Sequence, residues 1–246
     1  MKITKVEAFP AAAGRFWDRR PEEKGKHYVG LYIPYSEQTA KVLWKRKGVK
    51  TTFVRISTDE GLYGIGECKV VLAPEITCFI IEDVLKPILI GKDPFDLEAI
   101  WEWMYGLMKY RGQQKGFMLE AVSGVDMALW DLIGKATNKP VRKLLGGRLR
   151  DRIRAYSSSI LWGRKEEVVK TATKLLEEDH KAVKLKGGRG IEKDVEMIKS
   201  VRDAVGYEMD LMLDANCAYS LPNAIRLGRK LERYEVYWFE EPIPPE

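Results

Sequence analysis

Hydrophobic and polar residues alternate along the early part of the chain in the manner of strands. Residues 1–7 and 50–57 follow this two-residue period, and a third alternating stretch covers residues 62–67. A short turn of Asp, Glu and Gly separates the last two stretches, which predicts a β-hairpin. Residues 74–137 instead show the helical spacing of apolar positions, most clearly at 117–136.

From about residue 150 the pattern changes to a regular alternation of strand and helix. Each short apolar stretch is followed by an amphipathic helix, and the unit repeats. This order implies parallel strands joined by right-handed crossovers, in a barrel or in an open sheet. The predicted strands are 153–158, 182–186, 211–215 and 236–240, and the predicted helices are 165–179, 191–205 and 221–233.

The composition is that of a soluble globular protein. Its 246 residues are 45% hydrophobic and 10% aromatic, which excludes a disordered chain. The most apolar stretch, residues 76–90, is interrupted by charges and a proline, and the N-terminus lacks the apolar core of a signal peptide. We therefore expect no membrane partner. Three cysteines without a zinc-binding spacing favour a reducing, cytoplasmic location.

The distribution of charged residues and the small number of histidines indicate which partners and which metal ion to expect. The net charge of +6 is spread over both halves of the chain and comes without a nucleic-acid-binding motif, so we expect no nucleic-acid partner. The alternating arginines at 148–154 fit a solvated or ion-paired approach to a strand. With two histidines in the whole chain, any metal ion would be held by carboxylates, which favours Mg²⁺.

Two glycine-rich stretches look superficially like phosphate loops. Neither residues 64–66 nor residues 187–190 complete a phosphate-binding motif. For the second stretch we expect a flexible loop between a strand and a helix.

Charged residues end three of the four predicted parallel strands. Lys184 and Lys186 end the second, Asp214 ends the third with Asn216 just after it, and Glu240 ends the fourth. One strand–helix unit separates each group from the next, so the groups are expected at one level of adjacent strands, where functional residues of such folds gather. Two carboxylates beside two ammonium groups predict a Mg²⁺ and base site. The alternative is a set of solvated strand ends or structural ion pairs.

These residues also form motifs that resemble a known family. The motifs are Lys184-x-Lys186, Asp214-x-Asn216 and Glu240-Glu241-Pro242 at the strand ends, the helix 123–136 with the segment 140–147, and the hairpin 61–67. Together they resemble the mandelate racemase and muconate lactonizing branch of the enolase superfamily.

The resemblance implies a fold in two parts. Residues 1–125 would form an α+β capping domain, and residues 126–246 would form the N-terminal half of a (β/α)₈ barrel. The fold class would thus be a capping domain followed by a partial TIM-type barrel, with about four of its eight strands present.

The resemblance also implies an activity. The enzyme would use Mg²⁺ to remove the proton α to a carboxylate, which gives an enediolate. Lys186 and Lys184 would be catalytic residues: Lys186 would be the base, and Lys184 beside it would lower the pKa of that base and could also neutralise the substrate carboxylate. Asp214 and Glu240 would be metal ligands. We expect a sugar-acid dehydratase, which is a lyase; the alternatives are a racemase or epimerase, and a cycloisomerase.

Substrate binding is expected to involve a loop of the capping domain at residues 14–35. The candidate residues are His27 and Tyr28 in this loop, with Asn216 at the strand end. The partner would be a small carboxylate, most consistent with a sugar acid, and the full-length protein is expected to be a homo-oligomer. The family's third metal ligand and second catalytic group would lie beyond residue 246, so an inactive fragment is a further alternative.

Overall fold

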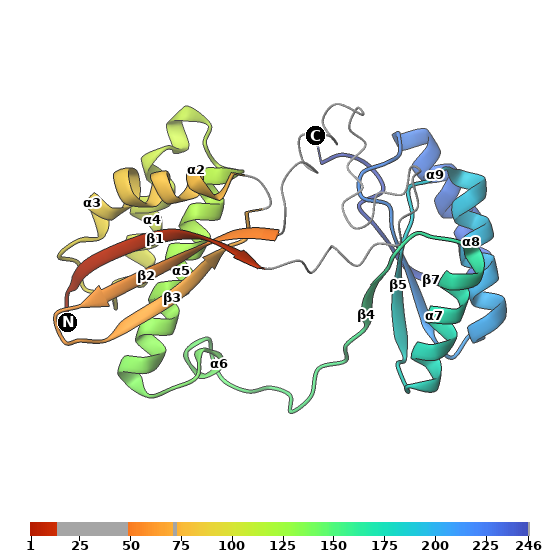
Figure 1. The fold of residues 1–246 in the computed structure, drawn as a ribbon, viewed down its shortest axis with the longest axis horizontal. Coiled ribbons are helices and arrows are strands. Elements are labelled where there is room, and N and C mark those ends of the chain that lie inside the picture. Colours follow the sequence, from red (N-terminus) through yellow and green to blue (C-terminus); the bar gives the residue numbers. More distant parts are fainter. Residues whose placement is uncertain (14–48, 71–72, 246) are drawn as a thin grey trace. The chain divides into compact units, whose positions relative to one another are not determined.

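The computed structural model describes residues 1–13, 49–70 and 73–245 and folds as two compact units. The first unit runs to Asp151 and the second begins at Arg152 in the described part of the chain (Figure 1). No helix in the described ranges is long and apolar enough to cross a membrane.

The first unit contains an antiparallel sheet of three strands in the order β1-β2-β3 among the described residues. Strands β2 and β3 form the predicted hairpin, which is therefore confirmed, and burial alternates along β3 so that one face of the sheet is covered. The strands are β1 (Ile3–Ala13), β2 (Val49–Thr58) and β3 (Tyr63–Cys68).

Helix α5 (Phe117–Thr137) covers this sheet and matches the predicted helix to within one residue (Figure 1). Its buried residues, such as Val125 and Leu129, join the core formed with β1 and β2. The helix runs without a break through positions 125 and 126, the predicted boundary between the two domains, and that boundary stays a prediction. The other helical segments of the unit are α2 (Pro74–Phe79), η1 (Ile80–Leu85), α3 (Lys86–Leu89), α4 (Leu97–Leu107), η2 (Lys109–Arg111) and α6 (Val141–Leu144).

Glycines let helix α5 lie directly on strand β3. A Cβ atom on Gly64 would lie 1.9 Å from the backbone oxygen of Ala128, and a Cβ atom on Gly66 would lie 1.9 Å from that of Gly124. Side chains at these positions would force the helix away from the sheet. The first glycine-rich stretch is therefore explained by close packing between a strand and a helix.

The second unit contains a parallel sheet of four strands in the sequential order β4-β5-β6-β7, within the described residues. Helices α7, α8 and α9 lie along one side of this sheet (Figure 1). A sequential order with helices on one side is the arrangement of a barrel wall, whereas a doubly wound sheet reverses its order. The elements are β4 (Ser157–Ile160), α7 (Lys165–Glu177), β5 (Ala182–Lys186), α8 (Ile191–Val205), β6 (Asp210–Asp214), α9 (Leu221–Leu231), η3 (Glu232–Tyr234) and β7 (Val236–Glu240).

The predicted strand–helix alternation is confirmed, with shifts at element ends. Strand β4 begins at Ser157, later than expected, and its register with β5 is irregular between Ser157 and Ile160. Exposed residues precede it, including Ile153, so the apolar character of that stretch does not reflect burial in a sheet.

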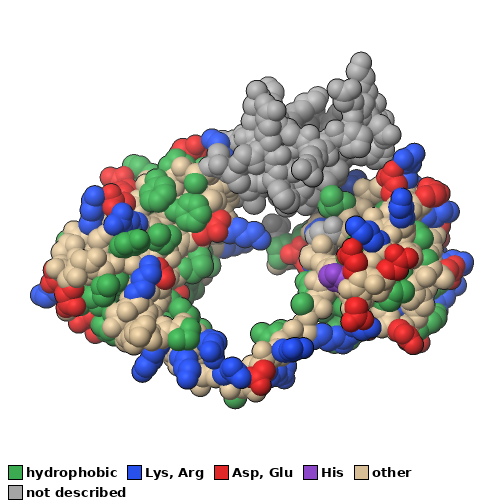
Figure 2. Space-filling view, turned by 60° about the horizontal axis from the view of Figure 1, so that its bottom comes forward, with side chains coloured by type: hydrophobic (Ala, Val, Ile, Leu, Met, Phe, Trp, Pro, Cys, Tyr) green, Lys and Arg blue, Asp and Glu red, His purple; other side chains and the backbone are tan. Residues whose placement is uncertain are grey.

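Basic side chains are interspersed with acidic ones over the surface seen in Figure 2. Two of the alternating arginines at 148–154 are ion-paired, which is one of the two arrangements predicted for them. Arg148 contacts Asp151, and Arg154 lies 2.6 Å from Asp210. Exposed pairs of this kind contribute little to stability.

Candidate active site

Three of the predicted site residues occupy one row across the parallel sheet. The register pairs the Cα atom of Lys186 with that of Asp214, and the Cα atom of Asp214 with that of Glu240. The sequence spacing predicted this common level, and the register confirms it.

Strand alternation explains why these side chains share a face. Val183 and Leu185 of β5 belong to the core beneath the helices, so Lys184 and Lys186 project from the other face of the sheet. Leu213 on β6 is likewise in the helix-side core, which turns Asp214 toward the lysines.

The four charged groups form an alternating set of ion pairs. The Nζ atom of Lys184 lies 2.7 Å from both carboxylate oxygens of Glu240 and 3.5 Å from Oδ2 of Asp214. The Nζ atom of Lys186 lies 2.5 Å from the same Oδ2 atom and 3.1 Å from Oδ1 of Asn216. Two positive and two negative groups thus neutralise one another, which is the ion-pair arrangement that the sequence left open as the alternative.

Burial makes this pairing necessary. Lys184 is 6% exposed and Asp214 is 2% exposed, and an unpaired charge at such depth is costly. Burial alone would lower the pKa of Lys184. The hydrogen bond to Glu240 and the negative charges of Glu240 and Asp214 outweigh burial and raise that pKa above its ordinary value. The two carboxylates therefore favour the charged form of Lys184.

Two aromatic residues that were not predicted from the sequence contact the four charged groups: Trp238 contacts Glu240, and Tyr156 contacts Lys184. Nε1 of Trp238 donates a hydrogen bond of 3.1 Å to Oε2 of Glu240. The ring of Tyr156 meets the ring of Trp238 edge-on at 5.1 Å, and Nζ of Lys184 lies 5.6 Å from the centre of the Tyr156 ring. Strand alternation would have found Trp238, since it precedes Glu240 by two positions.

Asn216 lies beside Asp214, and its backbone N–H donates to Oδ1 of Asp214 at 3.0 Å. Its contact with substrate stays a prediction. Alternation along the strand predicts that Glu241 lies on the face opposite Glu240, which ranks it below Glu240 as a metal ligand. Instead its Oε2 atom lies 3.4 Å from Nδ2 of Asn216. The strand ends at Glu240, and Glu241 adopts a left-handed backbone with φ of 41°, which breaks the alternation.

The donor set fits a hard divalent cation in its chemistry. Asp214 and Glu240 bring carboxylate oxygens to neighbouring places in one row, and Mg²⁺ prefers such ligands. Among the described residues, no group of three or more His, Cys, Asp or Glu side chains is placed to hold a metal ion. The predicted substrate residues His27 and Tyr28 and the loop 14–35 lie outside the described residues.

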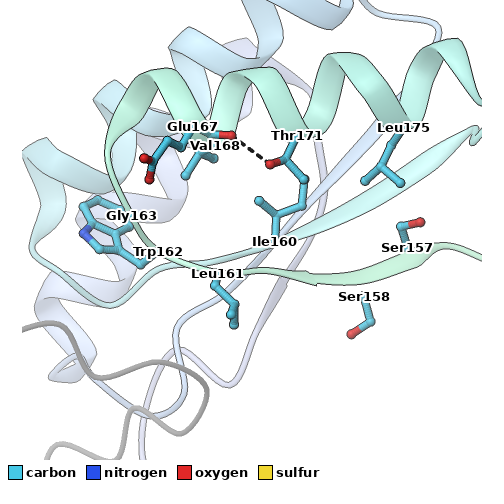
Figure 3. A pocket seen from close by; sticks show the side chains of 10 residues that line it. All are labelled: Ser157, Ser158, Ile160, Leu161, Trp162, Gly163, Glu167, Val168, Thr171 and Leu175. Atoms are coloured by element: carbon cyan, nitrogen blue, oxygen red, sulfur yellow. Dashed lines mark hydrogen bonds between the residues drawn. The ribbon is translucent and has the colours of Figure 1, made fainter. Parts of the chain in front are cut away.

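A cavity of about 540 Å³ lies elsewhere, between β4 and α7. Figure 3 shows Ile160 and Leu175 turned toward the space between strand and helix, while Leu161 points to the other side of the strand. This cavity contains none of the charged row and is not the candidate active site. Its lining residues are Ser157, Ser158, Ile160, Leu161, Trp162, Gly163, Glu167, Val168, Thr171 and Leu175.

Both units match known protein families. Residues 42–146 match the N-terminal domain of mandelate racemase / muconate lactonizing enzyme. Residues 167–246 match the family described as enolase C-terminal domain-like.

Curated relatives include enzymes that act on sugar acids and their lactones. The chain is 39% identical to D-galactarolactone cycloisomerase from Agrobacterium fabrum over 197 residues, which cover 78% of this chain and 51% of that protein. It is 35% identical to arabinonate dehydratase from Saccharolobus solfataricus over 192 residues, which cover 76% of this chain and 51% of that protein. The chain thus spans about half the length of the curated relatives it matches.

Solved structures agree with this relationship. The 3,6-anhydro-D-galactonate cycloisomerase from Zobellia galactanivorans aligns with a TM-score of 0.79 at 32% identity, covering 100% of this chain and 60% of that one. A mandelate racemase/muconate lactonizing protein from Paracoccus denitrificans, complexed with magnesium, aligns with a TM-score of 0.77 at 29% identity, covering 99% of this chain and 59% of that one.

The described fold is that of an N-terminal capping domain followed by four parallel strands with their helices, about 60% of the length of these solved structures. The strand-end motifs, the two-unit architecture and the two family matches agree with one another. The chain belongs to the mandelate racemase/muconate lactonizing family of the enolase superfamily.

Proposed function

We propose that this chain carries the base and two metal ligands of a Mg²⁺-dependent enzyme that removes the proton α to the carboxylate of a sugar acid. The observation that carries the proposal is the row in which Lys186, Asp214 and Glu240 are paired by register. A base beside two carboxylates is what this reaction needs, since the substrate gains negative charge as it loses the proton.

Each group of the row has a role in the proposed chemistry. Asp214 and Glu240 would hold Mg²⁺, which when bound stabilises negative charge on the substrate carboxylate. In its neutral amine form Lys186 would accept the α-proton at Nζ, and Asn216 contacts that Nζ atom and orients it. Lys184, which is ion-paired with Glu240, would contribute positive potential beside the row.

Dehydration is the reaction we favour, since three of the curated relatives are dehydratases of sugar acids. Loss of the α-proton breaks the Cα–H bond, and its electron pair expels the hydroxyl group on the neighbouring carbon. That hydroxyl leaves as water after it takes up a proton, and the enol that remains becomes a 2-keto-3-deoxy acid. Atoms balance as one substrate giving one keto acid and one water.

Cycloisomerisation is the second candidate, because two similar proteins act on a lactone and on an anhydro acid. The first step is the same, but the oxygen that leaves the neighbouring carbon belongs to a ring. It stays attached to the product, so no water is released. Racemisation or epimerisation would return the proton to the same carbon and give no keto acid.

A panel of sugar acids and their lactones separates these outcomes. The chain is incubated with each acid in the presence of Mg²⁺ and, separately, with excess chelator. We expect a keto acid that is lighter than its substrate by one water. It should form in the incubation with Mg²⁺ and not in the incubation with excess chelator. A keto acid of unchanged mass would favour cycloisomerisation. If no acid reacts with Mg²⁺ present, the proposed activity is wrong for this chain.

A further inference from the structure

A buried carboxylate and a buried phenol meet beside the charged row without belonging to it. The hydroxyl of Tyr219 donates to Oδ2 of Asp194 at 2.5 Å. Asp194 lies in the first turn of α8 and is 0% exposed, and Tyr219 lies in the loop after β6 and is 7% exposed. None of the roles proposed above uses either residue. A buried carboxylate is costly unless it is hydrogen-bonded, so the partners of Asp194 indicate what it does in the fold.

Asp194 holds the loop that follows Lys186. Its Oδ2 atom accepts a hydrogen bond from the backbone N–H of Gly188 at 2.7 Å, and its Oδ1 atom accepts one from Arg189 at 3.1 Å. Burial raises the pKa of Asp194, against the lowering effect of these bonds and of the Tyr219 hydroxyl. The carboxylate thus ties the start of α8 to the loop at the end of β5.

Several hydrogen bonds hold this loop, for which the sequence predicted a flexible segment. Gly187 donates its N–H to the backbone oxygen of Asp214 at 2.8 Å, and Gly190 donates to the Tyr219 hydroxyl at 3.2 Å. A Cβ atom on Gly188 would lie 2.6 Å from the backbone oxygen of Ala215. The glycines allow the loop after β5 to pack against the loop after β6.

Tyr219 also ties its own loop to the segment after β7. Its backbone N–H donates to the oxygen of Pro242 at 3.0 Å, and that of Cys217 donates to the oxygen of Glu241 at 2.6 Å. The ring of Tyr219 lies 6.4 Å from that of Phe239, centre to centre. One tyrosine therefore connects the three loops that follow Lys186, Asp214 and Glu240.

The loops after β6 and β7 contain residues with an unfavourable left-handed backbone conformation. Asn216 and Cys217 have φ of 46° and 60°, and Glu241 has φ of 41°. Non-glycine residues keep such left-handed conformations only where the surroundings impose them, and these residues directly follow two strands of the row. Cys217 and Glu241 are hydrogen-bonded to each other, and Tyr219, two residues after Cys217, bonds Pro242, the residue after Glu241.

We propose that Asp194 and Tyr219 are positioning residues, a buried clamp that fixes the strand ends of Lys186, Asp214 and Glu240 relative to one another. The inference rests on the proposed function of that row. Neither residue touches the reacting groups, and the clamp acts through the three loops. Loss of the clamp moves the base relative to the metal ligands, and small displacements of reacting groups have large effects on rate.

Tyr219→Phe tests the clamp because it removes one hydroxyl and keeps the ring. Hydrogen exchange of the backbone amides should become faster at 187–190 and 216–219, and stay unchanged in α7. The turnover rate at saturating substrate, per folded molecule, should fall about 10- to 100-fold while KM changes little. Tyr207→Phe is the matched control, since Tyr207 is exposed in the same unit and should leave both readouts unchanged.

Asp194→Asn completes a double-substitution cycle. If the two residues act as one clamp, the double variant should be no slower than the slower single variant. The free energy of unfolding is measured for every variant, so that rates refer to folded protein. A purely structural pair would lower stability and leave the rate per folded molecule unchanged, and that result would overturn the proposal.

The unmutated chain separates this inference from the function on which it rests. If it neither binds Mg²⁺ in calorimetry nor turns over any sugar acid, the proposed function has failed. Amide exchange in the Tyr219→Phe variant then tests, without any activity measurement, whether the clamp exists. Faster exchange in both loops would support it, and exchange at the rate of the unmutated chain would overturn it.

Discussion

Replacing Lys186 with alanine is expected to reduce exchange of the substrate α-proton by about 10²–10⁴-fold, the usual contribution of a general base. The proposed reaction begins at its Nζ atom, and the neighbouring amine on the same face of β5, that of Lys184, is bonded to both oxygens of Glu240. Proton nuclear magnetic resonance in D₂O follows the loss of the α-proton signal directly, whichever product forms later.

The fold of this variant should survive, because Asp214 keeps Lys184 at 3.5 Å. Lys199→Ala is a matched control: Lys199 is an exposed lysine of the same unit, paired with Asp203 on the surface of α8. Its exchange rate should equal that of the unmutated chain. Retention of exchange in Lys186→Ala, at a rate near that of the control, would remove Lys186 from its role as base.

Replacing Gly66 with alanine is expected to lower the free energy of unfolding of the first unit by about 3 kcal/mol or more. The added Cβ atom would lie 1.9 Å from the backbone oxygen of Gly124, and neither the strand nor the helix can yield without disturbing the core between them. Urea denaturation followed by circular dichroism measures the change.

Gly106→Ala is a control for which we expect a rise, and not a fall, in the free energy of unfolding. Gly106 lies within helix α4, and a Cβ atom there would meet nothing within 4 Å. Alanine should therefore stabilise the unit by about 0.5–1 kcal/mol through its better helix propensity. If Gly66→Ala unfolds at the same urea concentration as the unmutated chain, the close packing of α5 on β3 is not as described.

The sequence predicted the features that depend on periodicity. Alternation placed Lys184 and Lys186 on one face of their strand, and the repeating unit placed Asp214 and Glu240 at the level of Lys186, which the register confirms. Both follow from local geometry that any parallel strand obeys. The same reasoning gave the hairpin and the long helix of the first unit.

Features set by contacts between distant segments could not be predicted in this way. Lys184 lies closer to Glu240, two strands away, than to Asp214 on the adjacent strand, and spacing along the sequence cannot rank these two partners. Glu241 leaves the extended conformation, so alternation failed there. The bond between Asp194 and Tyr219 joins a helix to a loop 25 residues later, and neither residue belongs to a motif that spacing reveals.

Exchange of the α-proton in D₂O during a Mg²⁺ titration shows directly whether the row of strand-end residues forms a Mg²⁺-dependent base site. A sugar acid in the panel should lose its α-proton signal at a rate that rises with Mg²⁺, saturates, and returns to background when chelator is added. Exchange that is equally fast in excess chelator would rule out such a site. So would the absence of exchange from every acid at the highest Mg²⁺ concentration.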